Sequence, residues 1–292
     1  MKLTKAFITM SIILILSQSL LAGGPWPQSK GKGYYKLSEW WVIFDQHYTD
    51  QGLIDPNVTT GIFNTFFYGE YGLTDRITLN VNANLFSRNF TNNVVSGTTG
   101  DIIIAGEGLN AIGDIDLGVK YGLTQPGASF PIAASVLLGI PTGATGRGEQ
   151  QNLQTGDGEF NQMFQLDAGS GFNLGKTPAY FSLYSGINIR SNGFSEELRF
   201  GGEVGLSLIE SKLWIVSKLA VIESFKNGDT AANNTSTTIF ANNTEFASIA
   251  LEVNYYFTPQ FGISASYAGA LRGEIIAAAP SYSVGLFLDL SR

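Results

Sequence analysis

The sequence predicts a closed antiparallel β-barrel of about twelve strands that crosses an outer membrane. Three observations predict this all-β fold class: an export signal at the N-terminus, strands that alternate apolar and polar side chains, and short turns that alternate with longer loops. The segment 77–86 shows the alternation most clearly, because every apolar residue from Ile77 to Ala83 is followed by a polar one. The two sets project from opposite faces of a strand, so we expect the apolar set to face acyl chains and the polar set to face a lumen.

Composition narrows the function classes. The 292-residue chain has 17 basic and 24 acidic residues, which argues against nucleic-acid binding because that needs a basic face. It has no cysteine, so it has neither a disulfide framework nor a thiolate metal site, and we expect no cofactor. Charged residues make up only 14% of the chain, whereas glycine and phenylalanine are abundant. Beyond the N-terminal segment, no apolar run is long enough for a membrane-spanning helix.

The first 22 residues are typical of a signal peptide. Lys2 and Lys5 precede an apolar stretch, and Ala22 offers a small residue before Gly23, so we expect cleavage after Ala22. A retained anchor helix is the weaker interpretation, because the apolar stretch is short and glycine and proline follow it. We expect residues 23–32 to be an N-terminal periplasmic segment, either a loose tail or folded into the periplasmic mouth, with the tail favoured. Residues 33–292 would then form the barrel in the outer membrane of a Gram-negative bacterium.

The alternating segments recur along the rest of the chain. We expect strands at 34–46, 60–73, 76–86, 113–123, 130–140, 159–174, 179–190, 197–209, 213–224, 245–257, 261–271 and 282–290. Tight connections lie near Thr74, Gln125, Lys176, Ser211 and Pro259, and the opposite connections are mostly long, the exception being 191–196. Short periplasmic turns and longer extracellular loops are the pattern of a membrane barrel. Because an open sheet edge in hydrocarbon would leave unpaired backbone groups, the last strand should pair with the first.

Charged and polar side chains concentrate on one face of these strands. A lipid-facing Arg or Lys costs about 2–4 kcal/mol at the membrane midplane, so this face should line the lumen. The lumen-lining candidates are Glu39, Glu70, Thr78, Asn80, Asn82, Asn84, Asp114, Asp116, Lys120, Asp167, Arg199, Glu203, Lys218 and Glu252.

Aromatic residues gather at the strand ends beside the tight turns. Such a band is typical of an interfacial girdle, in which amphipathic rings lie at headgroup depth. A soluble, lipocalin-like barrel with core aromatics is the alternative, and the export signal and long loops favour the membrane barrel. The girdle candidates are Tyr71, Tyr121, Phe130, Tyr180, Trp214, Tyr255, Phe257 and Phe261.

Several short motifs resemble a known family. Residues 71–76 read Tyr-Gly-Leu-Thr-Asp-Arg, 113–121 contain Gly-Asp and Gly-Val-Lys-Tyr, 141–143 read Pro-Thr-Gly, and 155–156 read Thr-Gly. In this order the chain, from about residue 61 onward, resembles the outer-membrane barrels named for the MetA pathway of phenol degradation. The resemblance implies a β-barrel transporter and the passage of small, often aromatic, compounds.

Catalysis and metal binding are the rival chemistries. An outer-membrane esterase or phospholipase would need a serine–histidine pair, and the one histidine, His47, has Asp45 and Thr49 nearby but no serine two or three residues away. A surface histidine is the simpler interpretation. Asp114 and Asp116 share a strand face about 7 Å apart, and lumen solvation or pairing with a cation explains them more simply than a metal does. We expect neither an enzyme nor a tight metal site.

The expected function is passive passage of small aromatic or hydrophobic molecules through the barrel. Acidic lumen candidates outnumber basic ones, which predicts a weak preference for neutral or cationic solutes. The alternative is a non-conducting structural or surface-interaction barrel, and the less favoured one is the esterase. The expected partners are outer-membrane lipid, the outer-membrane assembly machinery and small neutral or aromatic solutes.

Overall fold

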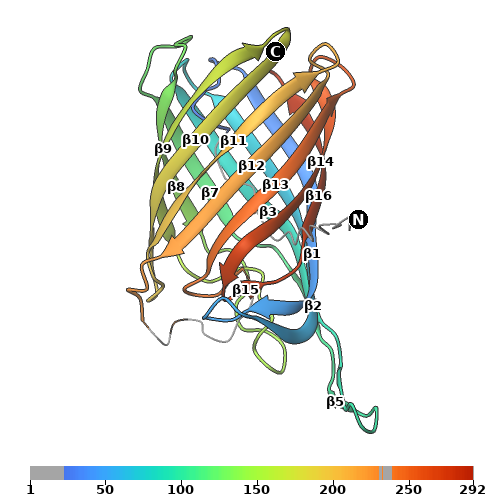
Figure 1. Cartoon of the computed structure of the whole chain (residues 1–292). Helices are drawn as coiled ribbons and strands as arrows, with labels where there is room; N and C mark the ends of the chain where they lie inside the picture. Colours follow the sequence, from blue (N-terminus) through green and yellow to red (C-terminus); the bar gives the residue numbers. More distant parts are fainter. Residues whose placement is uncertain (1–22, 230–231, 233–238, 292) are drawn as a thin grey trace, which may run out of the picture.

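The computed structural model describes residues 23–229, 232 and 239–291, so the predicted signal peptide lies outside the described residues. The described chain forms a closed, antiparallel barrel of 12 strands (Figure 1). The predicted fold class is confirmed. The barrel strands are β1 (Gly33–Tyr48), β2 (Ile54–Gly72), β3 (Ile77–Thr91), β7 (Ile115–Gly122), β8 (Ile132–Ile140), β9 (Asn161–Leu174), β10 (Thr177–Arg190), β11 (Glu197–Leu208), β12 (Leu213–Ser224), β13 (Glu245–Tyr256), β14 (Phe261–Glu274) and β16 (Ser281–Asp289).

The first strand closes the barrel. β1 pairs antiparallel with β2 on one side and with β16 on the other, where Tyr34 lies opposite Asp289 and Val42 opposite Ser281. Each remaining strand pairs with its neighbour in chain order, so the barrel has no open edge at which backbone groups would stay unpaired.

The two ends of the barrel differ, and we call them the short-turn end and the long-loop end. At the short-turn end, β2 joins β3 through residues 73–76. At the long-loop end, β6 (Gly108–Ala111) extends the pairing of β3, and β15 (Ile276–Ala277) that of β1. There, β4 (Val94–Val95) and β5 (Ile102–Ile104) form a hairpin that extends away from the barrel (Figure 1). Among the described residues, no helix is long and apolar enough to cross a membrane.

β16 shows how the two faces of the wall differ. Its alternate residues Tyr282, Val284, Leu286 and Leu288 are exposed on the outside, whereas Ser281, Ser283, Gly285, Phe287 and Asp289 are buried toward the interior. The apolar face is therefore the outer one, as a hydrocarbon environment requires and opposite to a soluble protein.

β3 interrupts this alternation once. Thr65 of β2 pairs with Phe86 and Phe66 pairs with Asn84, so Leu85 has no partner in the ladder and forms a β-bulge. Both Leu85 and Phe86 are exposed on the outer surface as a result.

An apolar cluster fills part of the interior near the long-loop end. It is built on inward-facing residues of β1, which pack against residues of β2, β13, β14 and β15 on the same side of the barrel. Its members are Trp40, Val42, Phe44, Tyr48, Ile62, Phe246, Ala270, Ile276 and Ala277.

Candidate functional site

Two cavities in the barrel interior are lined by residues that the structure describes. The larger one, which we call the chamber, lies toward the short-turn end and has a volume of about 620 Å³. The smaller one, the outer cavity, lies toward the long-loop end and has a volume of about 150 Å³. Phe66 and Asn82 line both cavities, so they lie at the boundary between them, which we call the waist.

Aromatic side chains dominate the chamber. The indole Nε1 atoms of Trp40 and Trp214 are buried and have no hydrogen-bond partner within the part of the chain that the structure describes. The aromatic residues that line the chamber are Trp26, Tyr34, Trp40, Phe66, Tyr68, Tyr180, Trp214, Tyr256 and Phe287.

A row of alternating charges crosses the chamber wall. Glu252 accepts from Lys36 Nζ at 3.3 Å and from Lys218 Nζ at 3.4 Å. Lys218 Nζ also lies 3.7 Å from Glu203, whose other oxygen accepts from the Tyr180 hydroxyl at 2.8 Å. Opposite charges from β1, β11, β12 and β13 therefore compensate each other. The otherwise aromatic wall of the chamber contains one row of charged side chains that are paired with one another.

The segment before β1 enters the chamber instead of forming a tail. The Gln28 backbone N–H donates to Thr78 Oγ1 at 2.8 Å, and its side-chain amide donates to Glu70 at 2.8 Å. The Trp26 ring packs edge-on against Tyr180, with centroids 5.7 Å apart. These contacts hold the segment at the short-turn mouth. The sequence favours a loose tail, and the structure shows its alternative, a segment folded into the mouth. The reason is that the chamber offers polar partners to a backbone that would otherwise bind only water.

Glu70 is the most heavily contacted carboxylate in the chamber. It is 2% exposed and accepts from Lys120 Nζ at 3.2 Å, and Lys120 is fully buried. The Tyr68 hydroxyl donates to the same carboxylate at 2.7 Å, and Asn80 donates at 3.4 Å. A buried charge needs this many donors, because an unpaired one would cost several kcal/mol.

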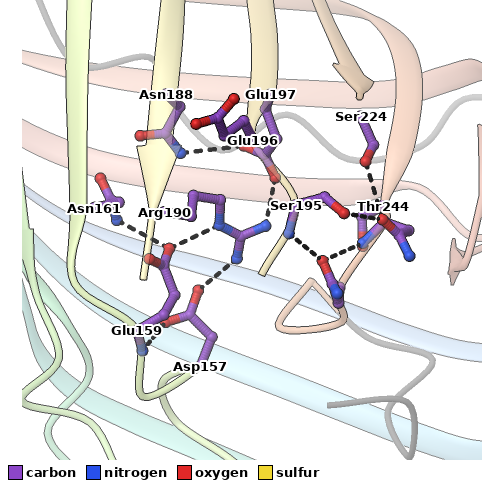
Figure 2. Close-up of polar contacts among 12 residues, drawn as sticks. Asp157, Glu159, Asn161, Asn188, Arg190, Ser195, Glu196, Glu197, Ser224 and Thr244 are labelled. Atoms are coloured by element: carbon purple, nitrogen blue, oxygen red, sulfur yellow. Dashed lines mark hydrogen bonds and ion pairs between the residues drawn. The ribbon is translucent and has the colours of Figure 1, made fainter. Parts of the chain in front are cut away.

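A second ionic network closes one side of the outer cavity. Arg190, at the end of β10, donates from Nη1 to Glu197 at 2.6 Å, from Nε to Glu159 at 2.8 Å and from Nη2 to Asp157 at 3.1 Å (Figure 2). Its guanidinium lies over the Phe194 ring at 4.4 Å. One rigid cation thus ties the barrel wall to the loop that carries Asp157 and Glu159.

Asp114 anchors the same loop, residues 141–160, from the other side. Its Oδ1 accepts from the Gly143 backbone N–H at 2.9 Å, and its Oδ2 accepts from the Asp157 N–H at 3.2 Å. Thr155, buried, links the two limbs of the loop by accepting from the Ala144 N–H. The Pro-Thr-Gly and Thr-Gly motifs at 141–143 and 155–156 therefore build an inward-folded loop at the long-loop end.

Burial changes the acidity of the loop carboxylates. It raises the pKa of Asp114 from 3.8 to about 6, against the opposing effect of its two backbone donors. Burial likewise raises the pKa of Asp157 to about 6, although Arg190 lowers it, and it raises the pKa of Glu159. Desolvation of the charged form is the cause in each case.

Another part of the outer cavity wall is apolar. Ile222 and Phe246 from the barrel wall, Ile276 of β15, and Ile239 and Phe240 of the loop before β13 form this part. A molecule in the outer cavity therefore meets both charged groups and hydrocarbon.

The structure places most of the predicted lumen candidates at these cavities. Asn82, Asn84, Asp114, Asp116 and Arg199 line the outer cavity, and Glu70, Asn82, Glu203, Lys218 and Glu252 line the chamber. Thr78, Asn80, Lys120 and Asp167 are buried on the same strand faces.

Glu39 does not belong to this set. Ser38 and Trp40 line the chamber, so the side chain between them lies on the outer face of β1, where Thr65 donates to it at 2.7 Å. The prediction chose the wrong face, because β1 carries apolar residues on both faces. Lys36 could have corrected this prediction, because it is a charged residue on the opposite face of β1 from Glu39.

Two predicted girdle residues also lie elsewhere. Tyr180 and Trp214 line the chamber, so they face inward. The remaining girdle candidates, Tyr71, Tyr121, Phe130, Tyr255, Phe257 and Phe261, are exposed on the outside. Closeness to a strand end does not decide which face a residue takes. Tyr180 and Trp214 lie an even number of positions from the inward-facing Ser182 and Lys218, respectively, so they face inward as well.

His47 has no catalytic partner in the described structure. Its Nδ1 has no hydrogen-bond partner there, and the neighbouring Asp45 is exposed. The described residues contain no group of three His, Cys, Asp or Glu side chains that could hold a metal ion.

Comparison with solved structures places the fold. The chain is similar to the crystal structure of the COG4313 outer membrane channel from Pseudomonas putida F1, with a TM-score of 0.61 and 16% sequence identity over 91% of this chain and 98% of that chain. The chain has the fold of an outer-membrane β-barrel. The KdgM porin is also similar, with a TM-score of 0.49 and 7% identity over 88% of this chain and 98% of that chain. No family model and no curated protein matches the sequence, so the MetA-pathway resemblance stays a prediction.

Proposed function

We propose that the chain is exported, loses residues 1–22 and forms an outer-membrane channel for passive passage of small aromatic or hydrophobic molecules. In this proposal the short-turn end faces the periplasm and the long-loop end faces outward. The observation that carries it is the aromatic chamber inside a closed barrel, whose volume of about 620 Å³ lies in the range of small-molecule sites.

The waist sets the permeability. A solute that crosses the barrel must pass Phe66 and Asn82, between an aromatic chamber and an outer cavity with one ionic and one apolar wall. Both sides offer apolar surface to an aromatic ring and hydrogen bonds to its polar substituents. The proposed role is non-catalytic: the interior binds and releases, and no covalent step is involved.

Solute flux tests the proposal. Liposomes that contain the purified barrel are compared for uptake of phenyl β-glucoside and methyl β-glucoside, which are both neutral and differ in the aromatic ring. We expect faster uptake of the phenyl compound and a further increase of both fluxes in Phe66→Ala, because the waist widens. Phe172→Ala is the matched control, since this ring is exposed on the outer surface. No flux of either compound in the wild type and in Phe66→Ala would overturn the channel proposal.

A non-conducting surface-interaction barrel is the second candidate, and the β4–β5 hairpin favours it. Ile102, Ile103 and Ile104 are exposed on this hairpin, away from the barrel. In such a protein the inserted N-terminal segment and the folded loop 141–160 would act as seals. An outer-membrane hydrolase is less favoured. This candidate is excluded if the wild type hydrolyses no esters, or if a His47→Ala variant keeps the full hydrolytic activity of the wild type.

A further inference from the structure

Gly23 lies at an unusual place for a residue that follows a signal peptide. Its backbone nitrogen is 2.8 Å from Glu70 Oε1 and 3.1 Å from the Tyr68 hydroxyl, inside the chamber. A peptide nitrogen carries one hydrogen and can make one good bond of this kind. An ammonium group carries three, so a free N-terminus matches the two acceptors better than a peptide bond does.

We propose that the cleaved N-terminus is a structural part of the barrel interior: the α-ammonium group of Gly23 binds the Glu70 carboxylate and holds residues 23–32 in the chamber. The inference rests on the export and cleavage after Ala22 that are part of the proposed function. It does not depend on whether the barrel conducts.

Charge balance supports the ammonium. Glu70 and Asp167 are both buried carboxylates that interact electrostatically with the buried cation Lys120. One cation shared by two carboxylates leaves a net negative charge among these buried side chains, which is costly. The terminal ammonium supplies the second positive charge at the required position, next to Glu70.

The space around Gly23 is narrow. A Cβ atom built on this residue would lie 2.9 Å from Glu70 Oε1 and 3.0 Å from Oε2, so a larger residue would require the end of the Glu70 side chain to shift. Glycine lets the chain nitrogen approach the carboxylate without that shift.

The rest of the segment is attached at points that hold it in register. Gln28 bonds both Thr78 and Glu70, and the Lys30 backbone N–H donates to Asp75 Oδ1 at 2.9 Å in the turn after β2. The segment is thus held at its first residue by charge and at its far end by the turn. Both attachments restrain the chain around Lys30, so the loss of either one should make the peptide bond after Lys30 more accessible to a protease.

The test uses the mature chain refolded with three different N-termini. One begins at Gly23, one begins at Gly23 with an Nα-acetyl group, and one carries Ala22 as an additional first residue. The readout is the rate at which trypsin cleaves after Lys30, an exposed residue, and releases residues 23–30. The acetylated chain keeps the peptide-type N–H but loses the charge, so the comparison isolates the ammonium.

We expect the free Gly23 chain to release the peptide at least about tenfold more slowly than either other chain, the ratio that 1.4 kcal/mol of docking energy gives. In Glu70→Gln the three rates should become equal. In Asp75→Asn, the matched control, all three should rise by a similar factor while their ratio stays. Equal rates for the free and acetylated wild-type chains would overturn the proposal, even if Glu70→Gln failed to fold. N-terminal sequencing of barrel isolated from outer membranes that gave a first residue other than Gly23 would also overturn it.

Discussion

The docking of loop 141–160 should depend on pH through Asp114. The pKa of this carboxyl is about 6 with the loop folded inward and near 3.8 in an exposed aspartate. A pKa raised by docking means that the docked loop binds the proton more tightly than the open loop. Docking stability is therefore full below about pH 4 and is lost as the pH rises through about 6.

The size of the effect follows from the two pKa values. Between about pH 5 and about pH 7.5, Asp114 alone should shift the docking equilibrium toward the open loop by about 1.4 kcal/mol, or about tenfold. Asp157, also with a pKa of about 6, should add to this shift in the same direction. Arg190 and Glu197 keep the network charged throughout, since Arg190 pairs with Glu197 at 2.6 Å.

Amide hydrogen exchange measures this directly, because the Gly143 and Asp157 amides are the donors to Asp114. After correction for the intrinsic exchange rate, the protection factor of a peptide spanning 142–158 should fall at least about tenfold from pH 5 to pH 7.5. In Asp114→Asn the fall should shrink to the part contributed by Asp157 and Glu159, whose pKa burial also raises. A wild-type protection factor that stayed constant or rose with pH would refute the reasoning, as would an unchanged fall in Asp114→Asn.

Three further outcomes follow from the same structure. Val81→Arg should reduce folding into lipid vesicles, measured by heat-modifiable electrophoresis, because the charge costs about 2–4 kcal/mol of insertion energy. Asn82→Arg at the waist should fold and lower solute flux. Equal folding defects in the two variants would contradict this assignment of faces. Lys120→Met should lower the urea midpoint by the equivalent of about 3 kcal/mol, because Glu70 loses its buried partner; an unchanged midpoint would show that the pair is dispensable. Arg190→Gln should release loop 141–160 at every pH, raising amide exchange there at least about tenfold and leaving β16 unaffected; unchanged protection of the loop would contradict its role as a tie.

The sequence predicted those parts of the barrel whose two faces differ in chemistry. β16 alternates apolar with small or polar residues from Ser281 to Leu286, and only Phe287 interrupts the pattern, so both its existence and its faces could be inferred. β1 could not be oriented in this way, because consecutive residues such as Trp40 and Trp41 are both apolar and point to opposite faces of the strand. Ile43 and Phe44 are a second such pair. The interior there is itself aromatic, which removes the contrast on which the inference depends, and Glu39 was assigned to the wrong side for that reason.

The candidate site was less predictable than the wall. The carboxylates and asparagines of β3 and β7 follow from alternation, but the inward fold of loop 141–160 depends on backbone N–H groups that meet Asp114. Backbone donors carry no sequence signal. The entry of residues 23–32 into the chamber likewise depends on Glu70 and Thr78, which lie far from this segment in sequence and become its neighbours only when β1, β2 and β3 pair.

The bulge at Leu85 has a consequence for the curvature of the wall at the waist. Asn84 pairs with Phe66 and Phe86 pairs with Thr65, so Leu85 is a residue in addition to the ladder, placed beside Phe66. Deleting Leu85 would leave Asn84 inward and Phe86 outward and would restore a regular pair of strands. The local bend that the extra residue imposes would be removed while every side chain facing the interior stayed the same. The curvature of the wall at this level thus depends on the length of β3, independently of the residues that line the interior.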